Sequence, residues 1–154
     1  MIAKLRELKS GLERLPSTVI TGDKMRMFRN VIDRELGFAK YGVEVWGAGT
    51  AIGKLPMSKK ATQALNDGHK ADLTVEHTIP VSVLYQSFAI AETDAEFQAV
   101  IDHYHVALVT KEENKAINRA YVGAQSRMPT GWKMGDAILA RYVIARLELE
   151  ANES

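Results

Sequence analysis

Amphipathic patterning at helical spacing runs through most of this sequence and limits the folds that it can adopt. Near the N-terminus, apolar residues recur at intervals of three and four among charged ones, which predicts a helix that ends at Pro16. The apolar stripe consists of Leu5, Leu8, Leu12 and Leu15. The same spacing could form the seam of a homodimer, but the stripe is too short to establish a coiled coil, and we expect it to pack inside the molecule.

Further helices and two short strands are predicted along the chain. Thr93 and Thr110 each stand three residues before a glutamate, which is a capping box that marks the start of a helix. Helices are also expected to begin near Asp23 and Ser58, and a last helix is expected over residues 136–150. The predicted strands are residues 73–77 and 106–109. The pattern therefore predicts an α+β fold that is mostly helical.

Length and composition indicate an ordinary globular protein. The chain has 154 residues, of which 46% are hydrophobic, so it can bury one core of its own. We expect a single domain over residues 1–154, with an N-terminal helical part (1–40), a glycine-containing loop and short helix (41–72), a central part (73–119) and a C-terminal turn and helix (120–154).

The sequence also limits the setting and the chemistry of the protein. No window reaches the roughly 18 unbroken apolar residues of a membrane span, and the N-terminus is too charged for a secretory signal. We therefore expect a cytoplasmic protein with no membrane partner. There is no cysteine, which excludes disulfide scaffolds, thiolate zinc sites and iron–sulfur clusters. Any metal must be held by histidine, asparagine and carboxylate side chains.

Positive charge is concentrated in the first half of the chain. Residues 1–75 carry 13 Lys and Arg against 8 Asp and Glu, whereas residues 76–154 carry 7 against 11. Four lysines surround the short helix predicted near Ser58: Lys54, Lys59, Lys60 and Lys70. They could contact the phosphates of a nucleic acid through attraction that does not depend on base sequence. A solvated polar face is the alternative interpretation.

The two predicted strands and the helix that follows them contain the residues that most clearly indicate a chemical function. Glu76 and His77 end the first predicted strand, and Asn114 lies in the first turn of the helix that follows the second strand. If an irregular backbone before Pro80 brings these side chains to one edge, their oxygen atoms suit a hard divalent cation with open coordination positions. The imidazole beside them could accept a proton near neutral pH.

Two stretches of this segment match a known motif. They are Glu76-His77-Thr-Ile-Pro80-Val-Ser82-Val-Leu84 and Ala107-Leu-Val-Thr-Lys-Glu-Glu-Asn114-Lys115. Together they resemble the HNH (ββα-metal) endonuclease superfamily, most closely the HNH domain of the CRISPR effector nucleases. The resemblance covers about residues 73–119 and implies a ββα-metal motif packed against the N- and C-terminal helices. It implies metal-dependent hydrolysis of phosphodiester bonds in a nucleic acid, with DNA favoured over RNA, in a protein of phage or defence origin.

The resemblance also implies a role for each matching residue. Glu76 and Asn114 would bind Mg²⁺ or Mn²⁺, and His77 would be the general base. His105 stands where the family has an asparagine that orients the base, so it could hold the base or bind the metal. Lys115 and Arg119, on the same predicted helix as Asn114, are expected to contact phosphate.

Two other functions stay open from the sequence. The chain could be a non-catalytic module that keeps the ββα frame and binds nucleic acid or a protein. It could also be a helical assembly factor that uses the stripe from Leu5 to Leu15.

Overall fold

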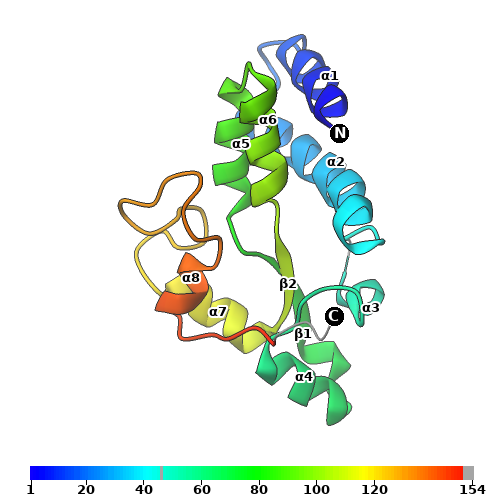
Figure 1. The fold of residues 1–154 in the computed structure, drawn as a ribbon, viewed down its shortest axis with the longest axis vertical. Coiled ribbons are helices and arrows are strands. Elements are labelled where there is room, and N and C mark those ends of the chain that lie inside the picture. The colour runs from blue at the N-terminus through cyan, green and yellow to red at the C-terminus, as the bar shows by residue number, and fades with distance from the viewer. Residues whose placement is uncertain (46, 151–154) are drawn as a thin grey trace.

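The computed structural model describes residues 1–45 and 47–150. Within them, a two-stranded antiparallel sheet lies between helices (Figure 1). The helices are α1 (Ile2–Glu13), α2 (Thr21–Tyr41), α3 (Ala48–Ala51), α4 (Lys59–Asn66), α5 (Val81–Ile90), α6 (Asp94–His103), α7 (Lys111–Arg119) and α8 (Ala140–Ile144), and the strands are β1 (Leu73–His77) and β2 (Val106–Thr110). The expectation of a mostly helical α+β fold is confirmed.

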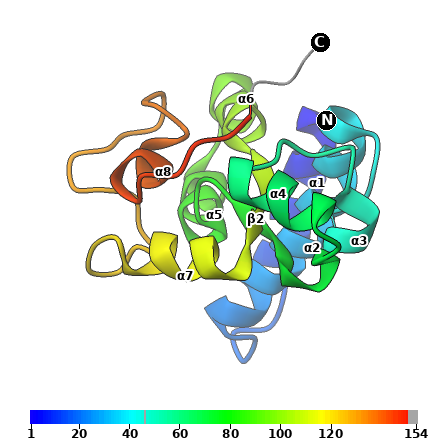
Figure 2. The ribbon, with the colours of Figure 1, turned by 90° about the horizontal axis from the view of Figure 1, so that it is seen from below.

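The sheet pairs the two segments that the sequence predicts as strands. Leu73 lies opposite Thr110 and His77 lies opposite Val106, so the strands run antiparallel over their full lengths. Helix α7 follows β2 directly and packs on both strands. The views in Figures 1 and 2 place α7 and α8 on one side of the sheet and α2 and α3 on the other. Residues from both sides can therefore meet at the end of β1.

Local capping chemistry sets the starts of three helices. Thr93 and Thr110 each accept a hydrogen bond from the backbone of the glutamate three residues later, and that glutamate side chain accepts one from the threonine backbone. The Ser58 side chain accepts a hydrogen bond from the backbone of Ala61 at the start of α4. These predicted helix starts are confirmed.

One expected helix has the wrong bounds, and another helix was not predicted. The last helix was expected over residues 136–150, but it covers only Ala140–Ile144. It ends because Arg146 takes a left-handed conformation with φ of 56°, and the backbone N–H of Leu147 then donates to the carbonyl of Tyr142. The following residues lie extended beside the start of α4, where the Glu150 N–H donates to the Met57 carbonyl. Helix α5, which begins directly after Pro80, was not predicted from the sequence.

The apolar stripe of α1 belongs to the core. Leu5 and Leu12 are buried in one cluster with residues of α2, α5 and α6, and Leu8 and Leu15 pack partly buried against it. The stripe therefore packs inside the chain, as expected, and its buried leucines are not available to a second copy. No helix in the described ranges combines the length and the apolar character that crossing a membrane requires.

Candidate functional site

A cavity of about 490 Å³ opens at the end of β1, between α2, the start of α5, α7 and α8. Its lining includes Glu76, His77 and Asn114, the three residues that the family resemblance identifies as ligands and base. The structure thus brings together side chains that lie almost forty residues apart in the sequence. Arginines of α2 and α8 complete the polar wall.

Backbone hydrogen bonds fix the end of β1. The residue after His77, Thr78, donates from its backbone N–H and from its hydroxyl to the carbonyl of His105. Pro80 then starts α5, a position that suits proline because the first helical N–H groups have no partner inside the helix. The strand therefore stops at His77, which leaves this side chain at the junction of sheet and helix.

A buried carboxylate holds the imidazole of His77. The Nε2 atom lies 2.7 Å from Oδ1 of Asp33 on α2, and both residues are less than a tenth exposed. With Asp33 ionised, this contact places the proton on Nε2, because a carboxylate can only accept. No hydrogen bond within the described residues occupies Nδ1. The free nitrogen is therefore the acceptor that a general base needs.

Asp33 is itself held from two further directions. The hydroxyl of Tyr104 donates to Oδ1 at 2.9 Å, and Nε of Arg29 lies 3.4 Å from Oδ2. Burial first, and then the Asp33 carboxylate, raise the pKa of Tyr104 far above its ordinary value of 10, so the hydroxyl keeps its proton and donates. The ring of Tyr104 also meets the ring of His77 edge to face, with centroids 5.9 Å apart. These contacts hold His77 in one orientation.

Glu76 forms an ion pair at the opposite side of the junction. Its Oε1 accepts a hydrogen bond of 2.8 Å from Nη1 of Arg141, which is 1% exposed. Arg141 also donates to the carbonyl of His77 at 2.9 Å and to Oδ1 of Asn118 at 3.2 Å. The guanidinium therefore ties α8 and α7 to the end of β1 and fixes the carboxylate of Glu76.

Two side-chain oxygen atoms at the cavity are of the type that a small hard cation binds. Mg²⁺ commonly takes one or two carboxylates and keeps several waters. Arg141 occupies one carboxylate oxygen of Glu76, so the second oxygen is the available ligand. Oδ1 of Asn114 accepts only a weak hydrogen bond of 3.4 Å from Asn118. Because the described residues contain no cluster of three or more His, Asp or Glu side chains suited to a metal, water and substrate would have to supply the other ligands.

His105 lies elsewhere. Its ring packs edge to face against Tyr41, and it does not line the cavity that holds His77. Burial, and to a smaller extent Lys40, lower the pKa of His105, which keeps the ring neutral. The family resemblance implied that His105 would hold the base or bind the metal. In the structure, Asp33 makes the hydrogen bond to His77, and the backbone carbonyl of His105 accepts hydrogen bonds from Thr78.

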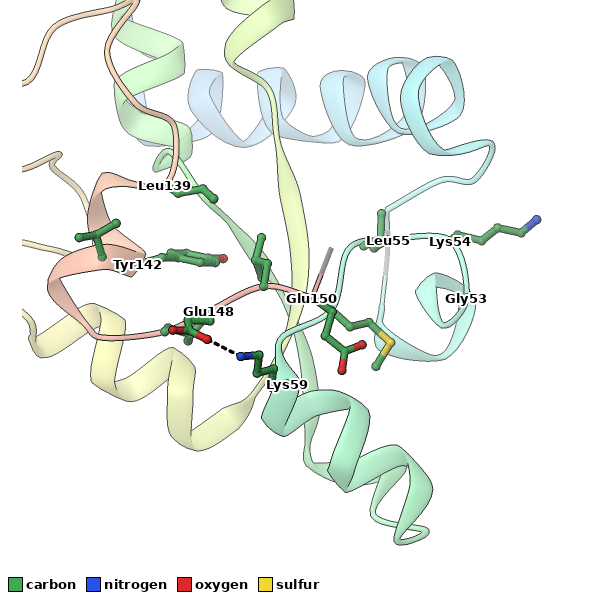
Figure 3. Close-up of a pocket in the computed structure, with 12 residues that line it drawn as sticks. Gly53, Lys54, Leu55, Lys59, Leu139, Tyr142, Glu148 and Glu150 are labelled. Carbon is green, nitrogen blue, oxygen red and sulfur yellow. Dashed lines mark hydrogen bonds and ion pairs between the residues drawn. The ribbon is translucent and has the colours of Figure 1, made fainter. Parts of the chain in front are cut away.

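The lysines around α4 are also separate from this cavity. Lys54 and Lys59 line another cavity, of about 1140 Å³, between α8, the C-terminal segment and the chain before α4. Figure 3 shows Lys59 paired with Glu148 and Lys54 extended away from the other lining residues. Lys60 and Lys70 are exposed and line neither this cavity nor the one at His77. The predicted basic cluster is therefore not beside His77.

Lys115 and Arg119 remain close to the site in the chain. Both are exposed on α7, the helix that carries Asn114 and Asn118 to the cavity, although neither of them lines it.

Sequence reasoning missed the residues that hold the site. Asp33 directly follows Ile32, which belongs to the apolar stripe of α2. This position next to a buried residue is the one feature of the sequence that could have suggested a buried carboxylate. Arg141 directly precedes Tyr142, and both are buried. A charged residue next to a core residue is usually a solvated one, so neither signal identifies a partner.

Comparison of the chain with models of protein families, with curated protein sequences and with solved structures finds no match.

Proposed function

We propose that the chain is a metal-dependent endonuclease of the HNH type, which hydrolyses phosphodiester bonds in DNA. The observation that supports this is the shared cavity of Glu76, His77 and Asn114, in which a buried carboxylate holds the imidazole by Nε2. A carboxylate, an amide oxygen and an oriented imidazole are the groups that this chemistry requires.

The proposed reaction begins at His77. Its Nδ1 takes a proton from a water molecule, and the oxygen of that water attacks the phosphorus. The bond from phosphorus to the 3′ oxygen breaks, the departing 3′ oxygen takes a proton from solvent, and the product carries a 5′ phosphate. A Mg²⁺ or Mn²⁺ held by Glu76 and Asn114 would supply stabilisation of the negative charge on that departing oxygen.

Asp33 supports this step in two ways. Its hydrogen bond to Nε2 selects the tautomer in which Nδ1 is free, and its negative charge stabilises the imidazolium that forms. Tyr104 and Arg29 keep the carboxylate in place while the proton moves.

A plasmid-nicking assay tests the proposal. Supercoiled DNA is incubated with Mg²⁺ or Mn²⁺ and with wild type, His77→Ala or His69→Ala, the last being a matched control because His69 lies in a turn outside the cavity. We expect wild type and the control to nick the plasmid, and His77→Ala to be slower by about 100-fold or more. An inert wild type, or a His77→Ala variant that is as fast as wild type, would contradict the proposal.

One observation favours a second candidate. Arg141 already neutralises the carboxylate of Glu76, as it would in a module that kept the ββα frame and lost its metal chemistry. Such a module would bind nucleic acid or a protein without cutting. DNA binding by wild type without any nicking in Mg²⁺ or Mn²⁺ would support it.

A further inference from the structure

We propose that Arg26 and Arg29 of α2 bind the DNA backbone at the rim of the His77 cavity, and that the lysines around α4 do not. This inference rests on the proposed function, because it assigns the surface that brings the scissile phosphate to His77.

The two arginines are placed to reach a phosphate. They lie one helical turn apart on α2, and both line the cavity that contains His77 and Glu76. Their side chains are 71% and 56% exposed, so a strand that lies over the cavity would meet them from solvent.

Their hydrogen-bonding capacity is largely unused. Arg29 contacts Asp33 through Nε alone, and its two terminal nitrogens carry no hydrogen bond within the described residues. Arg26 uses one terminal nitrogen for Asp23. Exposed ion pairs within one helix contribute little to the stability of a protein. A phosphate could therefore replace the carboxylate partner of either arginine or bind beside it. A guanidinium with free terminal nitrogens can bind two phosphate oxygens at once.

The charge of the cavity supports an anionic ligand. Among the residues that line it, Arg26, Arg29 and Arg141 are basic, and Glu76 alone is acidic. After Arg141 has paired with Glu76, the lining keeps the two guanidinium groups of α2, whose own partners, Asp23 and Asp33, do not line the cavity. Lys115 and Arg119 extend positive charge along α7 on the other side of the opening.

The cavity beside the start of α4 lacks this excess of positive charge. The cavity that Lys54 and Lys59 line also contains Glu148 and Glu150, and Lys59 is paired with Glu148. Positive and negative side chains are therefore balanced there, and the attraction for a polyanion is small.

Arg29 also connects binding to the proposed chemistry. It contacts the second oxygen of Asp33, whose first oxygen holds His77. A phosphate bound at Arg29 would therefore lie next to the carboxylate that orients the base.

Binding measured without divalent metal tests this inference apart from catalysis. The probe is a short fluorescein-labelled DNA duplex in EDTA, and anisotropy is followed over a range of salt concentrations. Wild type is compared with Arg26→Ala/Arg29→Ala and with Lys59→Ala/Lys60→Ala, which removes the same charge from α4. We expect the arginine variant to bind DNA at least about tenfold more weakly. The slope of the logarithm of its binding constant against the logarithm of the salt concentration should also become less steep by about two. The affinity of the lysine variant should change by less than about threefold.

Further variants exclude indirect effects. Arg26→Ala alone leaves the contact between Arg29 and Asp33 in place, and it should weaken binding by about threefold or more. His77→Ala should bind like wild type, so a catalytic failure in the nicking assay leaves this test valid. An equal or larger loss in the lysine variant, unchanged binding by the arginine variants, or no binding by wild type would overturn the inference. Tighter binding of a matched RNA duplex would overturn the choice of DNA.

Discussion

At the scale of single residues, the hydrogen bond from His77 to Asp33 is the contact on which the proposed chemistry most depends. Both groups are buried, and the partner comes from α2, outside the segment that carries the HNH-like motif. His77, the proposed base, lies in that segment, while the carboxylate that holds its ring comes from a helix distant in the sequence.

Replacing Asp33 with asparagine should impair catalysis while leaving the shape of the site intact. The amide lacks the negative charge that stabilises an imidazolium, and its N–H₂ can donate to Nε2 and so place the proton on Nδ1. We expect Asp33→Asn to slow plasmid nicking by about 100-fold or more. The control is Asp23→Asn, which changes an acidic residue at the start of the same helix. Equal rates for Asp33→Asn and wild type would show that the base does not need this carboxylate.

His105 predicts a dependence of stability on pH. Burial and Lys40 lower its pKa in the folded protein, so the unfolded chain binds the proton more readily. As the pH falls through the ordinary histidine value of 6.5, protonation then favours the unfolded state and lowers the free energy of unfolding. Urea denaturation from about pH 7.5 to about pH 5 should therefore show a steeper loss for wild type than for His105→Asn. His69→Asn is the control, and parallel curves for wild type and His105→Asn would contradict this account.

The sequence predicts that Glu76, His77 and Asn114 lie together, and they line one cavity; a strand end, a proline and a capped helix at recognisable spacings carry that information. It did not identify Asp33 or Arg141, which lie 44 and 65 residues from the groups that they contact. Nothing in the local pattern distinguishes such residues from a charged face in solvent, because only the packing of helices brings them to the site.

At the scale of secondary structure elements, Glu113 connects two capped helices. Its carboxylate accepts from the backbone of Thr110 at 2.9 Å in the capping box of α7. It also accepts from the hydroxyl of Ser58 at 2.6 Å, and Ser58 is the N-cap of α4. Ser58 and Glu113 are both buried, so one hydrogen bond joins the starts of α4 and α7 away from water.

Ser58→Ala should therefore cost more than an ordinary surface substitution. It removes the cap of α4 and leaves the buried Glu113 without one donor, so we expect a loss of about 2 kcal/mol in the free energy of unfolding. Ser10→Ala, on the exposed face of α1, should change it by less than about 0.5 kcal/mol. Urea denaturation measures both. Similar values for the two variants would mean that the buried hydrogen bond does not stabilise the fold.

Helices with a capping residue or a regular apolar stripe could be predicted from the sequence. Ser58, Thr93 and Thr110 each cap a helix where expected. The helix over residues 136–150 was overextended, because apolar spacing continues past Arg146 although the backbone turns there. Helix α5 was missed because it is mostly apolar, without a polar face that would reveal a helical period, and it begins without a side-chain cap.

At the scale of the whole molecule, the core uses the apolar stripe of α1. Leu5 is 1% exposed and Leu12 is 6% exposed, and α1 packs on α6. We therefore expect one chain, of 17.1 kDa, in sedimentation equilibrium. Leu5→Lys should lower the free energy of unfolding by about 3 kcal/mol or more, because it buries a charge in the core. If wild type had the mass of two chains and Leu8→Lys had the mass of one, the apolar stripe of α1 would instead form a dimer interface.

The cavity itself is a property of the whole molecule. Its walls come from α2, β1, α5, α7 and α8, which are spread from Gly22 to Arg141. The sequence predicts that Glu76, His77 and Asn114 lie close together. It does not predict that arginines of α2 line the cavity, or that an arginine of α8 forms an ion pair with Glu76.

Locating Mn²⁺ by anomalous diffraction would show whether Glu76 and Asn114 hold a metal ion beside His77. Crystals are soaked in Mn²⁺ and an anomalous difference map is calculated. We expect a peak about 2.1 Å from an oxygen of Glu76 and from Oδ1 of Asn114, with one water between the ion and the ring of His77. Mn²⁺ bound only elsewhere, with Glu76 paired to Arg141 and nothing beside Asn114, would contradict the assignment of this cavity as a nuclease site.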